Sequence, residues 1–157
     1  MIAEAGLAAL WMAAALALLQ LVMGAMALSP KYAGLTGGMV PVAVAQSAMA
    51  GTAFLALIAV FVRSDMSVLL VAMDSHSAKP LIYKISGTWG NHEGSMLLWV
   101  AILAVGGAAV ALYERALDTA TKVATLAAQG AISLGFYAFL LFSSNPFTRL
   151  DPAPLDG

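Results

Sequence analysis

The stretch that decides the fold class is GLAALWMAAALALLQLVMGAMAL, residues 6–28. Gln20 is its one strongly polar residue, and about 20 consecutive apolar residues are enough to cross the hydrocarbon core of a bilayer. A cleaved signal peptide is the alternative interpretation, but it requires a basic start and a shorter apolar core. The early charged side chain here is the acidic Glu4. The stretch therefore predicts a retained membrane-spanning helix.

Three further apolar runs follow the first, at residues 40–62, 95–112 and 123–142. In the chain of 157 residues, 62% are hydrophobic and 10% are charged, whereas a soluble domain is roughly half apolar and about one quarter charged. This composition excludes a soluble globular fold and a disordered chain. We predict an all-α integral membrane protein with one membrane domain over residues 1–157. Its four transmembrane helices are joined by short loops, except for a long external loop at 63–94 between the second and third, and an external tail follows at 143–157.

Charge and cysteine content remove several function classes. Seven Lys and Arg residues oppose eight Asp and Glu residues, and no basic cluster is present, so we expect no nucleic-acid partner. The absence of cysteine removes disulfides, iron–sulfur clusters and thiol chemistry. The four apolar runs also contain no Asp, Glu, Lys, Arg or His. Because transporters usually place such a group within the membrane, a small four-helix transporter is the weakest alternative.

The loops differ in their density of basic residues. Residues 29–39 and 113–122 hold three Lys and Arg in 21 positions, against four in the 52 positions of residues 1–5, 63–94 and 143–157. Lys and Arg accumulate in short cytoplasmic loops. We therefore expect the first pair of loops in the cytoplasm and the long loop on the external side.

Small and amide side chains recur within the apolar runs. Gln20 and Gln129 lie near the middle of their spans, where hydrogen bonds between helices are the expected role. Alanine and glycine are frequent in the first, third and fourth runs, and such residues let membrane helices approach closely. They predict tight packing within the bundle; the alternative is a surface that docks onto a larger membrane protein.

The densest polar chemistry is the segment TWGNHEGSMLLW, residues 88–99, at the start of the third run. Asn91 is the expected N-cap of a helix there, and Glu93 in the first turn complements the helix dipole. We predict that this segment contacts a substrate or a partner protein. The candidate site residues are Trp89, Gly90, His92, Glu93, Gly94 and Ser95.

A helix that starts after Asn91 places three chemically distinct side chains on one face: His92, Met96 and Trp99. An imidazole, a thioether and an indole could together hold the edge of a porphyrin or a quinone ring. The alternative is an interfacial cap, in which His92 is solvated and the tryptophans anchor in the headgroup region. No second histidine follows four residues after His92, so the segment is not a zinc motif.

The rest of the long loop also contains apolar stretches. Residues 68–73 are too short to span a membrane and suit a surface-lying or re-entrant segment. Leu81, Ile82, Ile85 and Trp89 recur at helical spacing, which predicts a helix lying in the membrane interface.

Two segments resemble one known family. They are SDMSVLLVAMDSHSAKPLIYKISGTWGNHEGSMLLWV, residues 64–100, and GFYAFLLFSSNPFTRLDPAPLDG, residues 135–157. Both are similar to external parts of the CcmF family, the membrane subunits of the haem lyase in cytochrome c maturation system I; the family's nitrite-reductase branch is also similar. The pieces TWGNHEGSMLLW and SNPF are specific to it. The resemblance extends over the whole chain in order, although family members are several times longer.

The resemblance implies haem as the bound group, with its ligands outside this chain. Family members carry a tryptophan-rich haem-binding motif, two external histidines and two histidines within helices. Here the tryptophans are scattered, at positions 11, 89 and 99, and no apolar run contains a histidine. His92 lies in a family motif but is not one of those ligands. No catalytic residue and no metal ligand is therefore assigned to this chain, and whether it is an enzyme by itself stays open.

The implied function is cytochrome c-type biogenesis, as the N-terminal four-helix part of a lyase that attaches haem covalently to apocytochrome c at the external face of the membrane. The implied partners are the remainder of the lyase polypeptide, other maturation subunits, a haem chaperone, apocytochrome c and membrane lipid. The implied location is the bacterial inner membrane, or the mitochondrial one in an organelle, with loop 63–94 in the periplasm. A natural split subunit and a truncated fragment both remain open. A structural or assembly subunit without ligand contact is the alternative function.

Overall fold

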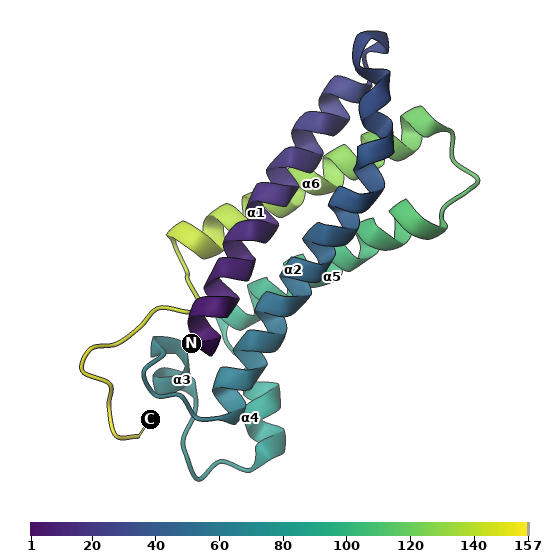
Figure 1. Cartoon of the computed structure of the whole chain (residues 1–157). Helices are drawn as coiled ribbons and strands as arrows, with labels where there is room; N and C mark the ends of the chain where they lie inside the picture. Colours follow the sequence, from purple (N-terminus) through teal and green to yellow (C-terminus); the bar gives the residue numbers. More distant parts are fainter. Residues whose placement is uncertain (157) are drawn as a thin grey trace.

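Two helical hairpins pack face to face in the computed structural model, which describes residues 1–156 (Figure 1). The first hairpin joins α1 (Ile2–Ala27) to α2 (Thr36–Val62) through the short 3₁₀ helix η1 (Pro30–Leu35). The second joins α5 (His92–Tyr113) to α6 (Thr119–Phe142). In the sequence, two short helices separate the hairpins: α3 (Leu69–Asp74) and α4 (Leu81–Gly87). All four long helices are long and apolar enough to cross a membrane, which confirms the predicted all-α chain with four helices of spanning length.

The long helices begin three or four residues before the predicted apolar runs, and in α5 and α6 a polar capping side chain precedes the first helical residue. α6 begins after Asp118, whose carboxylate accepts hydrogen bonds from the backbone N–H (3.1 Å) and the hydroxyl (2.6 Å) of Thr121. The loop expected over residues 29–39 is too long, since α2 begins at Thr36 and both Gly37 and Gly38 are helical. Apolarity thus marks the part of a helix that suits lipid, while a capping side chain marks the start of α5 and of α6.

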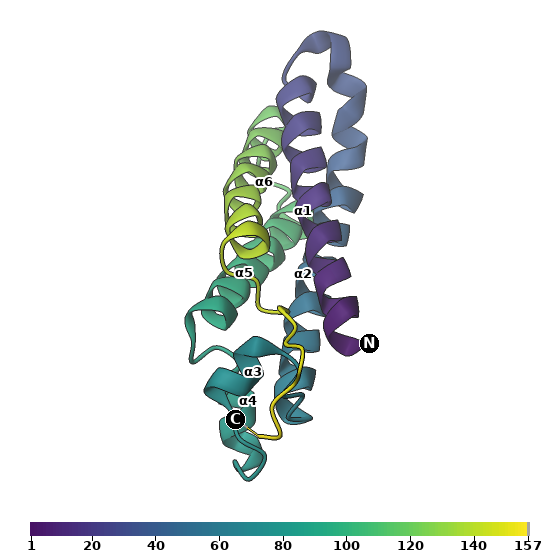
Figure 2. The same cartoon turned by 90° about the vertical axis from the view of Figure 1, so that its left-hand side faces the viewer.

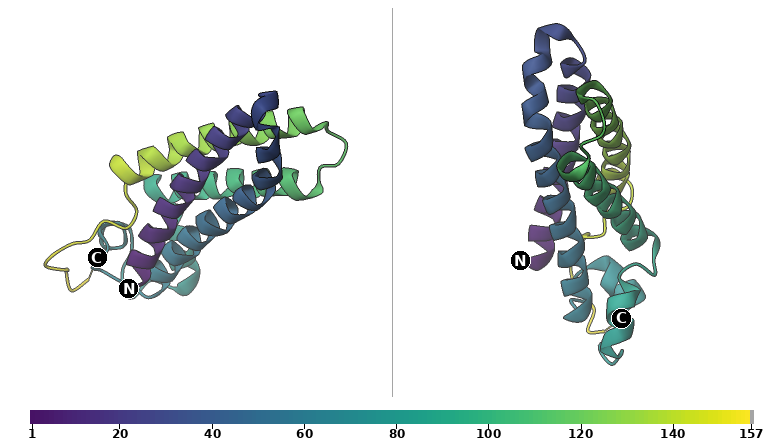
Figure 3. Two further views of the ribbon diagram at one scale, coloured as in Figure 1. Left: turned by 45° about the horizontal axis from the view of Figure 1, so that its top comes forward. Right: turned by 90° about the vertical axis from the view of Figure 1, so that its right-hand side faces the viewer.

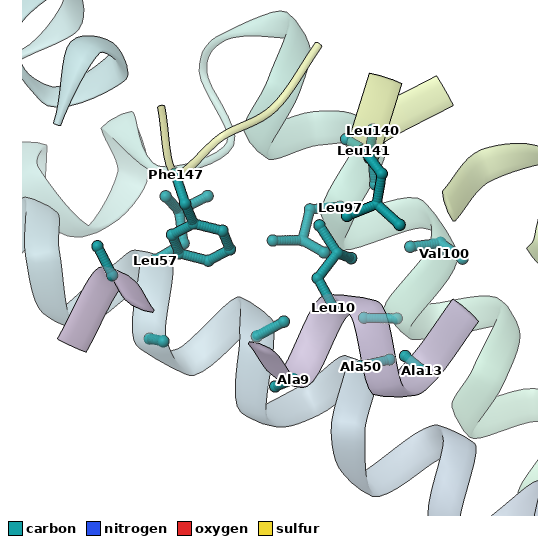
Figure 4. Close-up of a cluster of buried hydrophobic side chains, with 14 of the residues drawn as sticks. Ala9, Leu10, Ala13, Ala50, Leu57, Leu97, Val100, Leu140, Leu141 and Phe147 are labelled. Carbon is teal, nitrogen blue, oxygen red and sulfur yellow. The ribbon is translucent and has the colours of Figure 1, made fainter. Parts of the chain in front are cut away.

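The interior of the bundle is built on small residues. An ideal Cβ at Gly24 would lie 2.6 Å from the Cβ of Ala127, and one at Gly130 would lie 3.0 Å from the carbonyl oxygen of Ala17. These positions let α1 and α6 approach closely, as the tight-packing interpretation predicts. Larger side chains fill the space nearer the N-terminus, where Leu10 is fully buried among its neighbours (Figure 4).

A chain of amides and hydroxyls crosses the middle of the bundle. The Gln20 side chain on α1 donates to the side-chain oxygen of Gln129 (2.5 Å) and to the backbone oxygen of Leu126 (2.6 Å), both on α6. Gln129 in turn donates to Gln46 on α2 (3.4 Å) and to Ser133 (2.8 Å). The expected interhelical role of Gln20 and Gln129 is therefore confirmed, and these buried polar groups join three helices at one level.

One end of the bundle, called here the α4 end, gathers the N-terminus, residues 63–91 and the tail 143–156 (Figure 2). The region predicted as one long loop contains α3 at the short apolar stretch, and α4 where helical spacing was recognised. The tail runs back beside α3: Leu69 N–H donates to the carbonyl of Thr148, and Leu150 N–H donates to the carbonyl of Ser67, both at 2.8 Å. These bonds fix the tail against the segment before α3.

Candidate functional site at the start of α5

The turn that leads into α5 is organised by Asn91. Its side-chain oxygen accepts from the backbone N–H of Gly94 at 2.7 Å, and its amide nitrogen donates to the carbonyl of Gly87 at 2.9 Å. The hydroxyl of Ser95 donates to the Asn91 carbonyl at 2.9 Å. The predicted N-cap is therefore confirmed, and Asn91 ties the end of α4 to the start of α5.

The two glycines of the turn have different roles. A Cβ at Gly94 would lie 1.6 Å from the carbonyl oxygen of Thr88, a distance that no side chain can adopt. A Cβ at Gly90 would meet its nearest neighbours at 3.6 Å or more, which is ordinary contact. Gly94 is therefore required by close backbone approach, whereas the geometry at Gly90 does not require glycine.

Ser144, just beyond the end of α6, connects the two polar side chains in the first turn of α5. Its hydroxyl donates to Glu93 at 3.0 Å, and its oxygen lies 3.3 Å from Nδ1 of His92. The ring of His92 also packs edge-on against Phe139, with 5.5 Å between ring centroids. The hydrogen-bonded set His92–Ser144–Glu93 thus spans the gap between the start of α5 and the end of α6.

A small cavity of about 80 Å³ lies beside this set and is lined partly by Asp74, Glu93 and Asn145. Partial burial raises the pKa of the Asp74 carboxyl above its ordinary value, and the nearby charge of Glu93 raises it further. Lys79 opposes this shift. The ionised form of Asp74 is therefore less favourable here than in water, and a cationic group that approaches both carboxylates would offset this.

The six candidate residues do not share one set of contacts. Trp89 packs against Phe54 of α2, with ring centroids 6.4 Å apart, and remains 40% exposed. His92 and Glu93 face α6 through Ser144. Gly94 and Ser95 complete the cap. The predicted site is thus a turn with two sides: an aromatic side on α2 and a polar side on α6.

Arg149 in the tail holds the α4 end together from another direction. Its guanidinium donates to Glu4 of α1 at 2.8 Å and to Asp65 after α2 at 3.2 Å, and it also bonds Ser67. Partial burial works to raise the pKa of Asp65, but the hydrogen bonds from Ser67 and Arg149 outweigh it and hold that pKa below its ordinary value. This ion-pair cluster links the N-terminus, the segment before α3 and the tail.

Sequence reasoning missed the residues that the tail contributes. Phe147 is 2% exposed and is inserted between α1 and α2, where its ring would contact any Cβ added at Gly6 (Figure 4). Asn145 accepts from the backbone N–H of Phe147 at 2.9 Å. Both residues belong to the SNPF motif at residues 144–147. Within residues 1–156, no cluster of three or more His, Cys, Asp and Glu residues could hold a metal ion.

Comparison with known proteins gives one consistent family. Over all 157 residues the chain is 46% identical to the cytochrome c-type biogenesis protein Ccl1 of Rhodobacter capsulatus, and it spans 24% of that protein's length. It is 47% identical over 118 residues to CcmF of Pseudomonas aeruginosa, which is 74% of this chain and 18% of that protein. No family model matches the chain.

A solved structure agrees in fold. The chain superposes on a structure titled cytochrome c haem lyase CcmF with a TM-score of 0.87, covering 94% of this chain and 25% of that one at 24% identity. The chain thus spans about a quarter of the length of the curated relatives it matches. By sequence and by fold, it is an N-terminal part of the CcmF family of cytochrome c-type biogenesis proteins.

Proposed function

We propose that this chain is the N-terminal membrane part of a haem lyase that attaches haem covalently to apocytochrome c. The observation that supports the proposal most strongly is the 46% identity to a cytochrome c-type biogenesis protein along the entire chain. The reaction joins haem vinyl groups to cysteine thiols of the apocytochrome. Those thiols belong to the substrate, so the absence of cysteine here is compatible with the reaction.

In this proposal the α4 end faces the periplasm and the η1 end faces the cytoplasm. The N-terminus, residues 63–91 and the tail lie at one end, as an even number of spans requires. The higher density of Lys and Arg at the other end supports the orientation. The family resemblance gives the same direction.

The turn from Thr88 to Ser95 is the part of this chain that contacts haem, apocytochrome or the remainder of the lyase. Trp89 offers an exposed indole. Three and four residues further on, His92 and Glu93 offer an imidazole and a carboxylate, both held by Ser144. An indole suits a flat apolar ring, whereas an imidazole and a carboxylate suit polar groups. The haem ligands themselves lie in the other three quarters of the family polypeptide.

A full-length chimera tests the assignment of this turn. This chain replaces the matched quarter of Ccl1 in a Rhodobacter capsulatus strain that lacks Ccl1, and haem staining measures covalent haem on a reporter cytochrome c. Trp89→Ala and Glu93→Gln are expected to lower the stain at least threefold at equal chimera abundance, while His76→Ala, at an exposed loop position, leaves it unchanged. If all three variants behave like the parent chimera, the turn has no role in maturation and the chain is a structural subunit.

A further inference from the structure

Two hollows are lined by residues of the α5–α6 hairpin, whose two helices are seen from two further sides in Figure 3. One hollow of about 420 Å³ lies between Ile102, Gly106 and Gln129. A second of about 340 Å³ lies between Met96, Gly135 and neighbouring α6 side chains. On α5, Leu103 lines the first hollow and Met96 the second, and they are seven residues apart. On α6, Gln129 lines the first and Phe136 the second, again seven residues apart. Because residues seven apart share a helix face, both hollows lie on one face of each helix. Together they form a groove, called here the α5–α6 seam.

Two glycines in the seam are not explained by packing within this chain. An ideal Cβ at Gly106 or at Gly135 meets no atom within 4 Å. At Gly107, by contrast, a Cβ would lie 2.7 Å from the side-chain oxygen of Gln129, so that glycine serves the internal packing. Glycine weakens a helix, and in membrane helices it allows a second backbone to come close. Open glycines on an apolar groove therefore suit a helix, whereas a lipid chain gains nothing from them.

The floor of the seam needs no polar partner. Gln129 is 7% exposed, and its amide is already bonded to Gln20, Gln46 and Ser133. The rim is apolar, with Ile102 and Ile132 each more than half exposed. An apolar helix thus fits the seam without leaving a buried polar group unpaired.

The family supplies an occupant of this kind, since about three quarters of the length of Ccl1 lies outside the part that matches this chain. We propose that the α5–α6 seam is the docking groove for a transmembrane helix from that remainder, with its backbone against Gly106 and Gly135. This inference rests on the proposed function, because it takes the remainder of the lyase as the partner. It assigns the contact to one face of one hairpin.

The open glycines provide clean variants. Gly106→Leu and Gly135→Leu place a side chain into empty space, so the isolated chain is expected to fold as before, but they fill the seam. Gly51→Leu on α2 is the matched control, because a Cβ there also meets nothing within 4 Å and Gly51 does not line the seam. Tagged chain and the remaining three quarters of Ccl1 are expressed together as separate polypeptides, and recovery of the remainder with the tagged chain from detergent-solubilised membranes is measured.

We expect Gly51→Leu to recover the remainder as the parent does, and either seam variant to lower recovery at least tenfold at unchanged thermal stability of the chain. Equal recovery for all variants, or no recovery with the parent, would overturn the seam as the docking site. If the parent chain forms a dimer in detergent and Gly106→Leu abolishes that dimer, the seam binds a second copy of this chain. That result would also overturn the proposal that it binds a helix of the remainder. Haem staining of the same cells separates the two proposals, since maturation that persists with both seam variants rejects the groove and not the lyase function.

Discussion

The hydroxyl of Ser144, two residues past α6, donates a 3.0 Å hydrogen bond to the carboxylate of Glu93 in the first turn of α5. The bond joins the two ends of a hairpin whose connection lies at the opposite end of the bundle. It therefore fixes the position of the α5 start relative to the tail. The candidate turn is held by this bond from the α6 side and by Trp89 from the α2 side.

Ser144→Ala is expected to loosen this junction while the hairpins stay packed. The loss of a hydrogen bond to a carboxylate at a partly buried site costs about 1–2 kcal/mol. Thermal unfolding of the purified chain in detergent measures the loss. Ser143→Ala is the matched control, since Ser143 is exposed on the same turn. An equal change in both variants would mean that the bond to Glu93 contributes nothing specific.

Gly94→Ala is expected to be far more damaging than Gly90→Ala. The added methyl group at position 94 overlaps the Thr88 carbonyl, so the turn must shift and the Asn91 cap is weakened. Overpacking of this kind costs about 1–3 kcal/mol. Gly90→Ala is expected to change stability by less than about 0.5 kcal/mol, as is usual for surface substitutions. Denaturation of both variants in the same detergent compares their stabilities. Equal stability would contradict the close approach of Gly94 to the Thr88 carbonyl.

Two aspartates at the α4 end are expected to respond to neutralisation with opposite signs. The folded-state pKa of Asp74 is raised by burial and by Glu93, so its ionised form is less favourable in the folded chain than in the unfolded one. Asp74→Asn should therefore stabilise the chain at pH 7, by about 0.5 kcal/mol for a mostly solvated group. The gain should disappear below the ordinary pKa of 3.8, where the carboxyl is neutral in both states.

Asp65→Asn should instead destabilise the chain at pH 7. The pKa of Asp65 is lowered by its bonds to Ser67 and Arg149, although partial burial opposes them. Its contribution is thus present above the ordinary pKa and lost as the pH falls through the lower folded-state value. Melting curves of both variants from about pH 3 to about pH 7, a range that covers the titration of ordinary carboxyl groups, measure the effect. The same sign at pH 7 for both would contradict these assignments.

The membrane orientation can be read with single cysteines, because the native chain contains none. Ala78→Cys lies in the exposed loop between α3 and α4, and Thr119→Cys is exposed at the start of α6. A membrane-impermeant maleimide added to intact cells or spheroplasts is expected to label position 78 and spare position 119. Permeabilised cells, in which both positions react, are the control. Labelling of 119 and not 78 would falsify the orientation.

The four long helices could be predicted because each contains an apolar run long enough to span a membrane. Residues 6–28 and 123–142 are examples of such runs. The start of α6 could not, since its cap Asp118 is a single side chain outside the apolar run. The Asn91 cap was recognised because Glu93 and an apolar helix follow it. Local chemistry thus predicts an element when the signal is repeated and misses it when one residue decides.

The candidate site was only half predictable for the same physical reason. Trp89, His92 and Glu93 lie within five consecutive positions, so the motif is visible without a structure. Ser144 and Asn145 lie about 50 residues away and join the turn only through the packing of α6. Their part in the site follows from hairpin geometry, which no local pattern encodes.

Covalent haem on a reporter cytochrome c tests the central claim most directly. The remaining three quarters of Ccl1 is expressed without and with this chain in a strain that lacks Ccl1, and the haem-stained reporter is compared at equal amounts of the remainder. The account predicts a reporter without stain when the chain is absent and a strong stain when it is present. Equal staining in the two strains, whether full or absent, would contradict the claim that this chain is a working part of the haem lyase.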